Sequence, residues 1–371
     1  MKGMVVHMKP NYRKEMVNRS LISTGDNVRM KKAIHKAQQG EETVLVYLGG
    51  SITMRKKELE DRGYADASFR FFKEKVVPDG KLTYINSGMN GTSSIIGLIR
   101  MERDVLQYNP DIVFVEFSVN DSKDNVHREA FESIIVRLLE SENKPAVVLV
   151  FLQSEGGYSC QGHMQVIGEH YGLPMISVCD AIQPEIEAGR MNWSEYADDN
   201  IHPHMGGNDL ITEFISHYYE TVIGEEPDED AEVPKEPFYG TAFKNMRLLD
   251  SMNLKPQSAG GFEAKDTIAE FPNGWIHTIQ AENKSFLFRL EFKDLFVVYK
   301  ESGNVSEGSM VVSIDGKDVS TYSGYRTFGW DNPTARLVYS EDICKEHTVE
   351  IKMAKGEEAK EFSLLAFGYC K

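Results

Sequence analysis

Between residue 43 and about residue 222 the chain alternates between short apolar runs and stretches in which apolar residues recur with helical spacing. The apolar runs, which are rich in β-branched residues, fall at 43–48, 82–86, 112–117, 146–151 and 175–178. Helical spacing is found at 64–77, 92–107, 125–142, 159–171 and 206–222. Continuous apolar strands separated by helices indicate a parallel sheet that is covered on both faces. This part of the chain is therefore predicted to be a three-layer α/β/α domain.

The pattern changes beyond residue 237. Segments such as SFLFRLEF, SMVVSIDGK and HTVEIKMA alternate apolar and polar positions and are separated by Gly, Asn, Asp and Ser. Such alternation predicts half-buried strands, so we expect an antiparallel β-sandwich here. The segment just before it, GEEPDEDAEVPKEP, carries a run of acids and three prolines, a composition that is typical of a solvated linker.

These patterns predict three regions. The α/β domain should span residues 1–224, with an N-terminal extension at 1–42 that contains a helix over 27–39. An acidic linker should follow at 225–237, and an all-β domain at 238–371.

The formal net charge of the 371 residues is −16. A surface of this sign repels phosphate-rich partners, which argues against nucleic acid and against an anionic membrane surface. No stretch approaches the roughly 20 apolar residues that span a bilayer, and the apolar stretch at the N-terminus is too short for a secretory signal. We therefore expect a cytoplasmic protein. The sequence leaves open whether its copies form a homo-oligomer.

The cysteines are widely scattered and form no C-x-x-C pair. This arrangement favours buried free thiols over metal or redox use. The histidines and acids show no zinc-ligand spacing either, so the sequence implies no metal and no cofactor.

A serine, an aspartate and a histidine have the spacing of an acyl-transfer site. Ser51 directly follows the first apolar run, at the strand end where open α/β sheets bind ligands. Asp199 precedes His202 by three residues in a turn-forming stretch, so one loop can hold the carboxylate against the imidazole. Nucleophile, base and orienting carboxylate are the parts of nucleophilic acyl transfer. Each stretch alone also fits a plain turn, and Asp198 competes for the orienting role.

Two further loops carry groups that can stabilise an oxyanion. The stretch 86–93 follows the second strand, and a glycine at a helix start can aim its N–H at a developing negative charge. Asn120 follows the third strand and offers a neutral amide donor. Capping by Thr92 or Ser93, and a turn at Asn120 and Asp121, are the alternatives. The occurrence of all four stretches in order favours the catalytic interpretation.

Over residues 43–222 the chain resembles the SGNH hydrolases, also called the GDSL family of esterases. GGSIT resembles the nucleophile block, NSGMNGTSS the glycine block, SVND the asparagine block and DDNIHP the final block. The resemblance implies that Ser51 is the nucleophile, that His202 is the base and that Asp199 is its partner. It also implies a flavodoxin-like sheet with strand order 2-1-3-4-5.

The same resemblance implies an oxyanion hole formed by the N–H groups of Ser51 and Gly91 and by the Asn120 amide. Two positions depart from the family pattern. Gly50 stands where the family has an aspartate before its serine, and Ser118 stands where the family has a glycine.

The second half resembles the jelly-roll partners of carbohydrate esterases from gut and rumen bacteria, several of which remove O-acetyl groups from xylan or mannan oligosaccharides. We therefore expect a serine esterase that acts on an acetylated oligosaccharide through an acyl-enzyme intermediate. Tryptophan faces suit the C–H face of a pyranose, so the candidate sugar contacts are Trp193, Trp275 and Trp330. Ordinary core packing explains each of them at least as well.

Two other functions remain in competition. The first is a lipid, thioester or general short-chain acyl hydrolase; a lipase needs a broad apolar groove or lid, whereas the chain after Ser51 is charged (MRKKELEDR). The second is a non-catalytic carbohydrate-binding protein, against which the intact set of four blocks argues.

Overall fold

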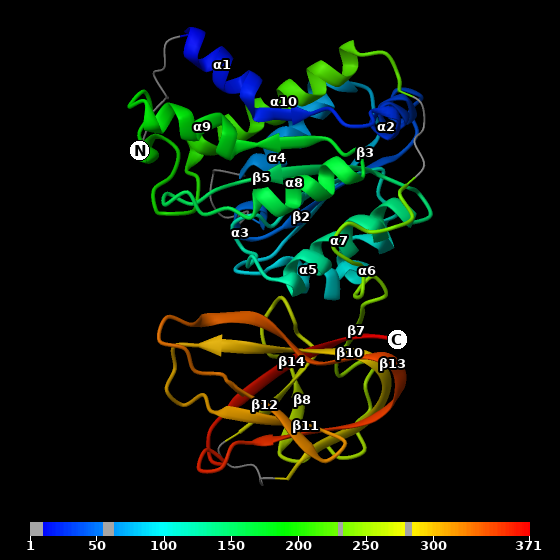
Figure 1. Ribbon diagram of the computed structural model, residues 1–371, viewed down its shortest axis with the longest axis vertical. Coiled ribbons are helices and arrows are strands. Elements are labelled where there is room, and N and C mark those ends of the chain that lie inside the picture. The colour runs from blue at the N-terminus through cyan, green and yellow to red at the C-terminus, as the bar shows by residue number, and fades with distance from the viewer. Residues whose placement is uncertain (1–9, 55–62, 229–232, 279–283) are drawn as a thin grey trace. The chain divides into compact units, whose positions relative to one another are not determined.

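The computed structural model of the protein describes residues 10–54, 63–228, 233–278 and 284–371 (Figure 1). Its internal contacts divide the chain into two compact units. The first comprises Met1–Gly97 and Met101–Thr241, and the second comprises Leu98–Arg100 and Ala242–Lys371.

The first unit is built on a six-stranded sheet. Its parallel strands are β2 (Thr43–Gly49), β3 (Leu82–Gly88), β4 (Ile112–Glu116), β5 (Ala146–Phe151) and β6 (Met175–Ser177). They lie in the order β3-β2-β4-β5-β6, which confirms the parallel sheet and the 2-1-3-4-5 strand order. A short strand, β1 (Leu21–Ser23), adds an antiparallel edge beside β6. Three residues are too few to show an alternating pattern in the sequence.

Helices cover both faces of this sheet (Figure 1). On one face, apolar side chains of the strands share a core with α1 (Pro10–Ser20), α2 (Val28–Gln38), α4 (Gly63–Phe71), α9 (Val178–Glu187) and α10 (Met205–Gly224). On the other side from α10 lie α5 (Ser94–Ile99), α6 (Met101–Asp104), α7 (Asn125–Glu140) and α8 (Gln161–His170). The structure therefore has the predicted three layers.

Some helices differ from the sequence prediction. The helix expected over 92–107 is divided, because α5 ends at Ile99 and α6 begins at Met101. The backbone leaves helical geometry again at Val105 (φ −131°) before a 3₁₀ turn at Leu106–Tyr108. The helix expected over 64–77 ends in a π-helical turn at Phe72–Val76.

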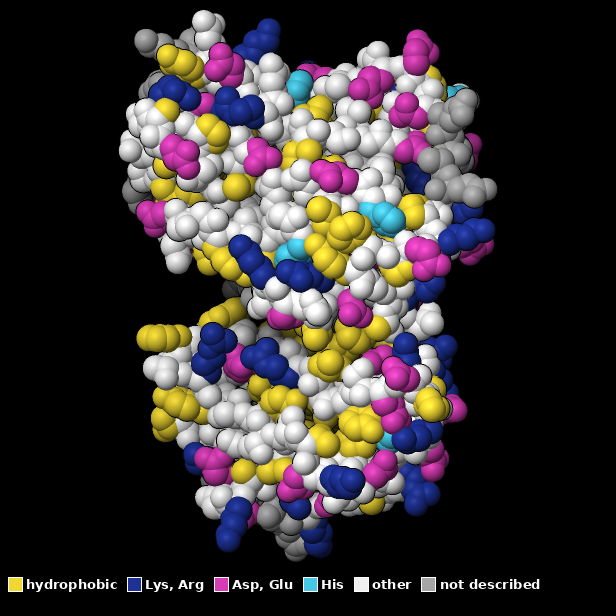
Figure 2. All heavy atoms as spheres, viewed as in Figure 1, with side chains coloured by type: hydrophobic (Ala, Val, Ile, Leu, Met, Phe, Trp, Pro, Cys, Tyr) yellow, Lys and Arg dark blue, Asp and Glu magenta, His cyan; other side chains and the backbone are white. Residues whose placement is uncertain are grey.

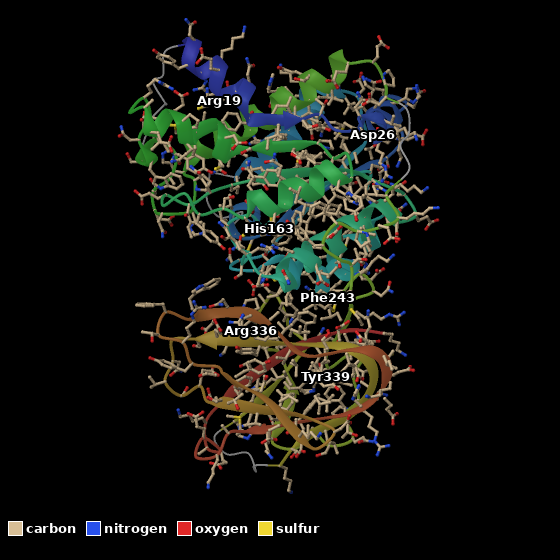
Figure 3. All side chains as sticks on the ribbon, in the orientation of Figure 1. Arg19, Asp26, His163, Phe243, Arg336 and Tyr339 are labelled. Atoms are coloured by element: carbon tan, nitrogen blue, oxygen red, sulfur yellow. The ribbon has the colours of Figure 1, made fainter. Side chains whose placement is uncertain are left out.

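Neither α1 nor α9 was predicted. α9 begins directly where β6 ends, and the Ser177 hydroxyl caps it by accepting the Asp180 N–H at 2.8 Å. Arg19 of α1 (Figure 3) donates to the Ala181 carbonyl of α9 at 3.1 Å and pairs with the buried Glu185. These contacts join segments about 160 residues apart, so no local pattern in the sequence reveals them.

All the regular elements that the structure describes between residues 242 and 371 are strands. They are β7 (Arg247–Leu249), β8 (Phe262–Lys265), β9 (Gly274–His277), β10 (Phe286–Ser302), β11 (Ser309–Ile314), β12 (Lys317–Ser323), β13 (Trp330–Met353) and β14 (Phe362–Cys370). They form one antiparallel sheet in the order β12-β11-β13-β10-β14-β9-β8, with β7 paired to β14. Register shifts along the long β10–β13 pair allow the sheet to curl around an aromatic core. The all-β, jelly-roll-like domain is thus confirmed.

On the face drawn in Figure 2, acidic and basic side chains are intermingled on each unit.

The chain that follows α10 belongs to the first unit as far as Thr241 and is hydrogen-bonded to other parts of that unit. The N–H of Asp228 donates to Asn27 Oδ1 at 3.0 Å. The buried carboxylate of Glu132 accepts the N–H groups of residues 238–240 at 2.5, 2.6 and 2.9 Å. Asp228 lies inside the predicted linker at 225–237, residues 238–240 follow the linker directly, and part of the linker is outside the described residues. The limits of the domains therefore remain a prediction.

Candidate active site

The register of the sheet brings three strand ends together. Gly49 at the end of β2 is paired with Gly88 of β3 on one side and with Glu116 of β4 on the other. The Met89 N–H donates to the Gly49 carbonyl at 3.0 Å, so the loop after β3 begins against the end of β2. Because these strands are parallel, the loops that follow them lie at the same edge of the sheet. Those loops carry Ser51, Gly91 and Asn120.

Ser51, His202 and Asp199 form a continuous hydrogen-bonded chain. Ser51 Oγ lies 3.0 Å from His202 Nε2, and His202 Nδ1 lies 2.8 Å from Asp199 Oδ2. The tautomer with its proton on Nδ1 satisfies both contacts, because it leaves Nε2 free to accept the Ser51 proton. The neighbouring Asp198 is exposed, and the imidazole faces Asp199.

The carboxylate of Asp199 is held in its charged form. Its Oδ1 accepts the N–H groups of Ile201 at 2.7 Å and His202 at 2.6 Å. Burial acts to raise the pKa of Asp199, but these bonds and the imidazole contact outweigh burial and hold the pKa below its usual value. A charged carboxylate at this position fixes the orientation of the imidazole.

The loop that carries Asp199 and His202 is braced by main-chain contacts. The Trp193 indole N–H donates to the Asp199 carbonyl at 2.6 Å, and the Glu155 N–H donates to the Asn200 carbonyl at 2.9 Å. An antiparallel bridge between residues 197 and 203 closes the loop. The site thus rests on a loop whose geometry is fixed on both sides.

His204 caps the helix that follows this loop, a role that the sequence did not reveal. Its Nδ1 accepts the Gly206 N–H at 3.0 Å, and its Nε2 lies 3.2 Å from the Ser194 carbonyl. The pattern His-Met-Gly-Gly contains none of the usual capping side chains, so only the geometry of the loop identifies the cap.

Both departures from the family pattern have structural consequences. A Cβ at Gly50 would lie 2.3 Å from Asn120 Oδ1, so the glycine leaves room for the Asn120 side chain against the turn that precedes Ser51. The Ser118 hydroxyl donates to the Leu152 carbonyl at 3.0 Å and accepts the Leu152 N–H at 2.7 Å. Ser118 therefore ties the loop after β4 to the end of β5.

Gly91 has a positive φ of 63°, which lies in the left-handed region that strains L side chains. The Thr92 hydroxyl closes this turn by donating to the Met89 carbonyl at 2.9 Å. Thr92 is thus part of the turn, and α5 begins two residues later at Ser94. The conformation explains why this position in the loop is a glycine.

Two buried carboxylates lie beneath these loops, and the sequence interpretation gave neither a catalytic role. Burial raises the pKa of Glu116 to about 7, although N–H groups from Ser118 and Gly50 oppose the shift. Burial also raises the pKa of Asp121 to about 7, opposed by His127 and by bonds from Ser94. The one signal in the sequence is the acid inside the apolar run IVFVEF.

The three tryptophans have different environments. Trp193 is 9% exposed and packs against Tyr196 with a ring separation of 5.0 Å. Its indole N–H donates to the Asp199 carbonyl, so this side chain supports the loop that contains Asp199. Trp275 is 2% exposed and packs between Phe286 and Phe367, which removes it from the candidate sugar contacts. Trp330 is 55% exposed and keeps an accessible aromatic surface.

Within the described residues, no group of three or more His, Cys, Asp or Glu side chains is arranged to hold a metal ion. None of the helices in the part of the chain that the structure describes is long and apolar enough to cross a membrane.

Comparison with known proteins points to one family. Residues 47–210 match the model of the GDSL-like lipase/acylhydrolase family. A two-domain esterase (CEX) active on acetylated mannans, co-crystallised with mannopentaose, is 26% identical, with a TM-score of 0.86 over 96% of this chain and 98% of that chain. A second structure, of a two-domain esterase (CEX) active on acetylated mannans, is 26% identical, with a TM-score of 0.86 over 96% of this chain and 99% of that one. No curated protein matches the chain in sequence.

The matched residues span the strand ends and loops that carry Ser51, Gly91, Asn120, Asp199 and His202. Residues 47–210 therefore form a GDSL-like lipase/acylhydrolase domain, and the protein is a carboxylic ester hydrolase.

Proposed function

We propose that this esterase removes O-acetyl groups from oligosaccharides derived from mannan or xylan. Ser51 is the nucleophile, His202 the general base and Asp199 the orienting carboxylate. The oxyanion hole consists of the N–H groups of Ser51 and Gly91 and the amide of Asn120. The observation that carries the catalytic proposal is the unbroken chain of contacts from Ser51 Oγ to His202 and on to Asp199, at 3.0 and 2.8 Å.

The reaction proceeds in two steps. Ser51 Oγ attacks the acetyl carbonyl while His202 Nε2 takes the hydroxyl proton, and the carbonyl oxygen becomes an oxyanion. His202 then returns the proton to the sugar oxygen as the C–O bond breaks, which leaves an acetyl-serine. Water then attacks the carbonyl carbon of the acetyl-serine while His202 takes its proton. His202 returns that proton to Ser51 Oγ as the acyl C–O bond breaks, which releases acetic acid and restores Ser51. Asp199 stabilises the imidazolium in both steps.

The substrate class is supported by similarity to the esterase that is active on acetylated mannans, which extends over 96% of this chain. The exposed aromatic surface of Trp330 suits a sugar ring and is retained as a candidate contact. The cytoplasmic location and the self-association left open by the sequence stay predictions.

The substrate is tested by mass spectrometry of acetylated mannan and xylan oligosaccharides before and after incubation with the full chain. We expect losses of single acetyl groups with wild type and none with Ser51→Ala. Faster turnover of a long-chain p-nitrophenyl ester than of p-nitrophenyl acetate would favour a lipid hydrolase instead. Binding of the oligosaccharides with no release of acetate by wild type would identify a carbohydrate-binding protein.

A further inference from the structure

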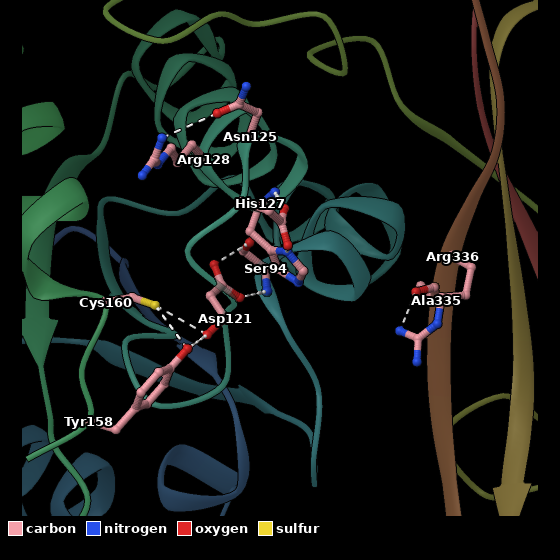
Figure 4. A network of polar contacts seen from close by, with 10 residues as sticks. Ser94, Asp121, Asn125, His127, Arg128, Tyr158, Cys160, Ala335 and Arg336 are labelled. Atoms are coloured by element: carbon pink, nitrogen blue, oxygen red, sulfur yellow. Dashed lines mark hydrogen bonds and ion pairs between the residues drawn. The ribbon is translucent and has the colours of Figure 1, made fainter.

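A buried aspartate connects the two loops that carry the proposed oxyanion donors. Asp121 directly follows Asn120, and Ser94 stands three residues after Gly91. Asp121 Oδ1 accepts the Ser94 N–H at 2.7 Å, and Asp121 Oδ2 accepts the Ser94 hydroxyl at 2.6 Å (Figure 4). The two residues are 2% and 0% exposed, so water cannot readily replace either bond.

The main chain of Asp121 is fixed as firmly as its side chain. Its carbonyl accepts the Tyr158 hydroxyl at 2.5 Å and the Cys160 thiol at 3.1 Å (Figure 4). Its N–H donates to the Phe117 carbonyl at 3.0 Å. The residue therefore has no freedom to follow a movement of Ser94 without disturbing the turn that holds Asn120.

Keeping a carboxylate at this position is costly. Burial raises the pKa of Asp121 to about 7, which means that the surroundings do not fully compensate for its lost hydration. A helix cap does not require such burial, since an exposed Ser, Thr or Asn serves equally well. The helix that begins at Ser94 is only six residues long, so a cap alone would contribute little.

We propose that Asp121 is a positioning residue that sets the distance between the Gly91 N–H and the Asn120 amide in the oxyanion hole. The inference rests on the proposed function of those two donors. Stabilisation of a developing oxyanion depends on donors that already stand at the right separation. A double hydrogen bond between the two loops, one residue from Asn120 and three from Gly91, supplies that separation directly.

The experiment compares Asp121→Ala, Asp121→Asn, Ser94→Ala and Asn120→Ala in the full chain. The readouts are kcat and KM for p-nitrophenyl acetate. The value of kcat is expressed per reactive Ser51, which is counted by stoichiometric labelling with a fluorophosphonate. The inhibition constant of phenylboronic acid, whose tetrahedral adduct places an oxygen in the oxyanion hole, is measured in parallel.

We expect Asp121→Ala to lower kcat by about a hundredfold, comparable to the loss of one oxyanion donor, with KM changed by less than about threefold. Boronate inhibition should weaken in parallel. Asp121→Asn should recover most of kcat, because its oxygen accepts the Ser94 N–H and its amide donates to the Ser94 hydroxyl. Ser94→Ala keeps one of the two bonds, so its kcat should fall by about tenfold. This is less than the loss of about a hundredfold expected when an oxyanion donor is removed.

Two results distinguish a failure of the positioning role from a failure of the proposed oxyanion hole. If Asn120→Ala loses activity strongly while Asp121→Ala keeps wild-type kcat per labelled serine, the positioning role is overturned and the oxyanion hole stands. If Asn120→Ala itself keeps full activity, the proposed oxyanion hole is wrong. Should Asp121→Ala not fold, Ser94→Ala decides the question, because unchanged kcat and boronate affinity in that variant also overturn the inference.

Discussion

The pH dependence of the free energy of unfolding should reflect the titration of the buried Glu116 carboxyl group. This side chain is fully buried, and its Oε2 has no hydrogen-bond partner among the described residues. The Ser118 hydroxyl approaches Oε1 only at 3.5 Å. Burial raises the pKa of Glu116 from 4.5 to about 7, so the folded protein favours the neutral acid below about pH 7.

The sign and size of the effect follow from this shift. Because the folded-state pKa is raised, the stabilising contribution is complete below pH 4.5 and is lost as the pH rises through about 7. At about 1.4 kcal/mol for each pKa unit, the loss amounts to about 3 kcal/mol. Glu116→Gln removes the charge, so wild type should lose about 3 kcal/mol relative to this variant between about pH 4 and about pH 8.

Urea unfolding followed by the helical circular dichroism signal measures this difference, because the described helices belong to the α/β domain. The prediction concerns how the difference in free energy of unfolding between wild type and Glu116→Gln changes with pH. Its absolute value is not used, because the new amide changes stability through its own hydrogen bonds. Glu142→Gln, on an exposed turn, controls for the loss of one negative charge. A stability difference between wild type and Glu116→Gln that stays constant within about 1 kcal/mol across this range would refute the reasoning.

Three further predictions concern the loops of the site. Trp193→Phe removes the bond to the Asp199 carbonyl, at a cost of about 1–3 kcal/mol, and should lower kcat about tenfold with KM unchanged; a raised KM with normal kcat would point back to a sugar contact. Gly50→Ala must displace Asn120 and should lower kcat in steady-state assays at least about tenfold, whereas the control Gly156→Ala, which meets nothing within 4 Å, should not. Asp199→Asn should lower kcat by about 10²- to 10⁴-fold; an equal loss in the adjacent Asp198→Asn would contradict the assignment.

Much of this architecture is a local property of the sequence. The parallel strands follow from continuous apolar runs, and the alternation after residue 237 predicted the antiparallel domain because both patterns reflect the burial of nearby side chains. Ser51, Gly91 and Asn120 could be assigned to one edge, because parallel strands present their carboxyl ends together. The three-residue spacing between Asp199 and His202 likewise lies within one loop.

Only the tertiary structure decided what depends on contacts between distant segments. The burial of Trp275, the bond from the Glu155 N–H to the Asn200 carbonyl and the position of α9 against α1 have no local signature. Asp121 looks like an ordinary acid in the sequence, and only the apolar run around Glu116 hints at burial. The pKa values of both carboxyl groups are shifted because the surrounding loops exclude water. Local patterns fix which residues stand at the end of each strand, whereas solvent exclusion and long-range hydrogen bonds determine how those residues are held.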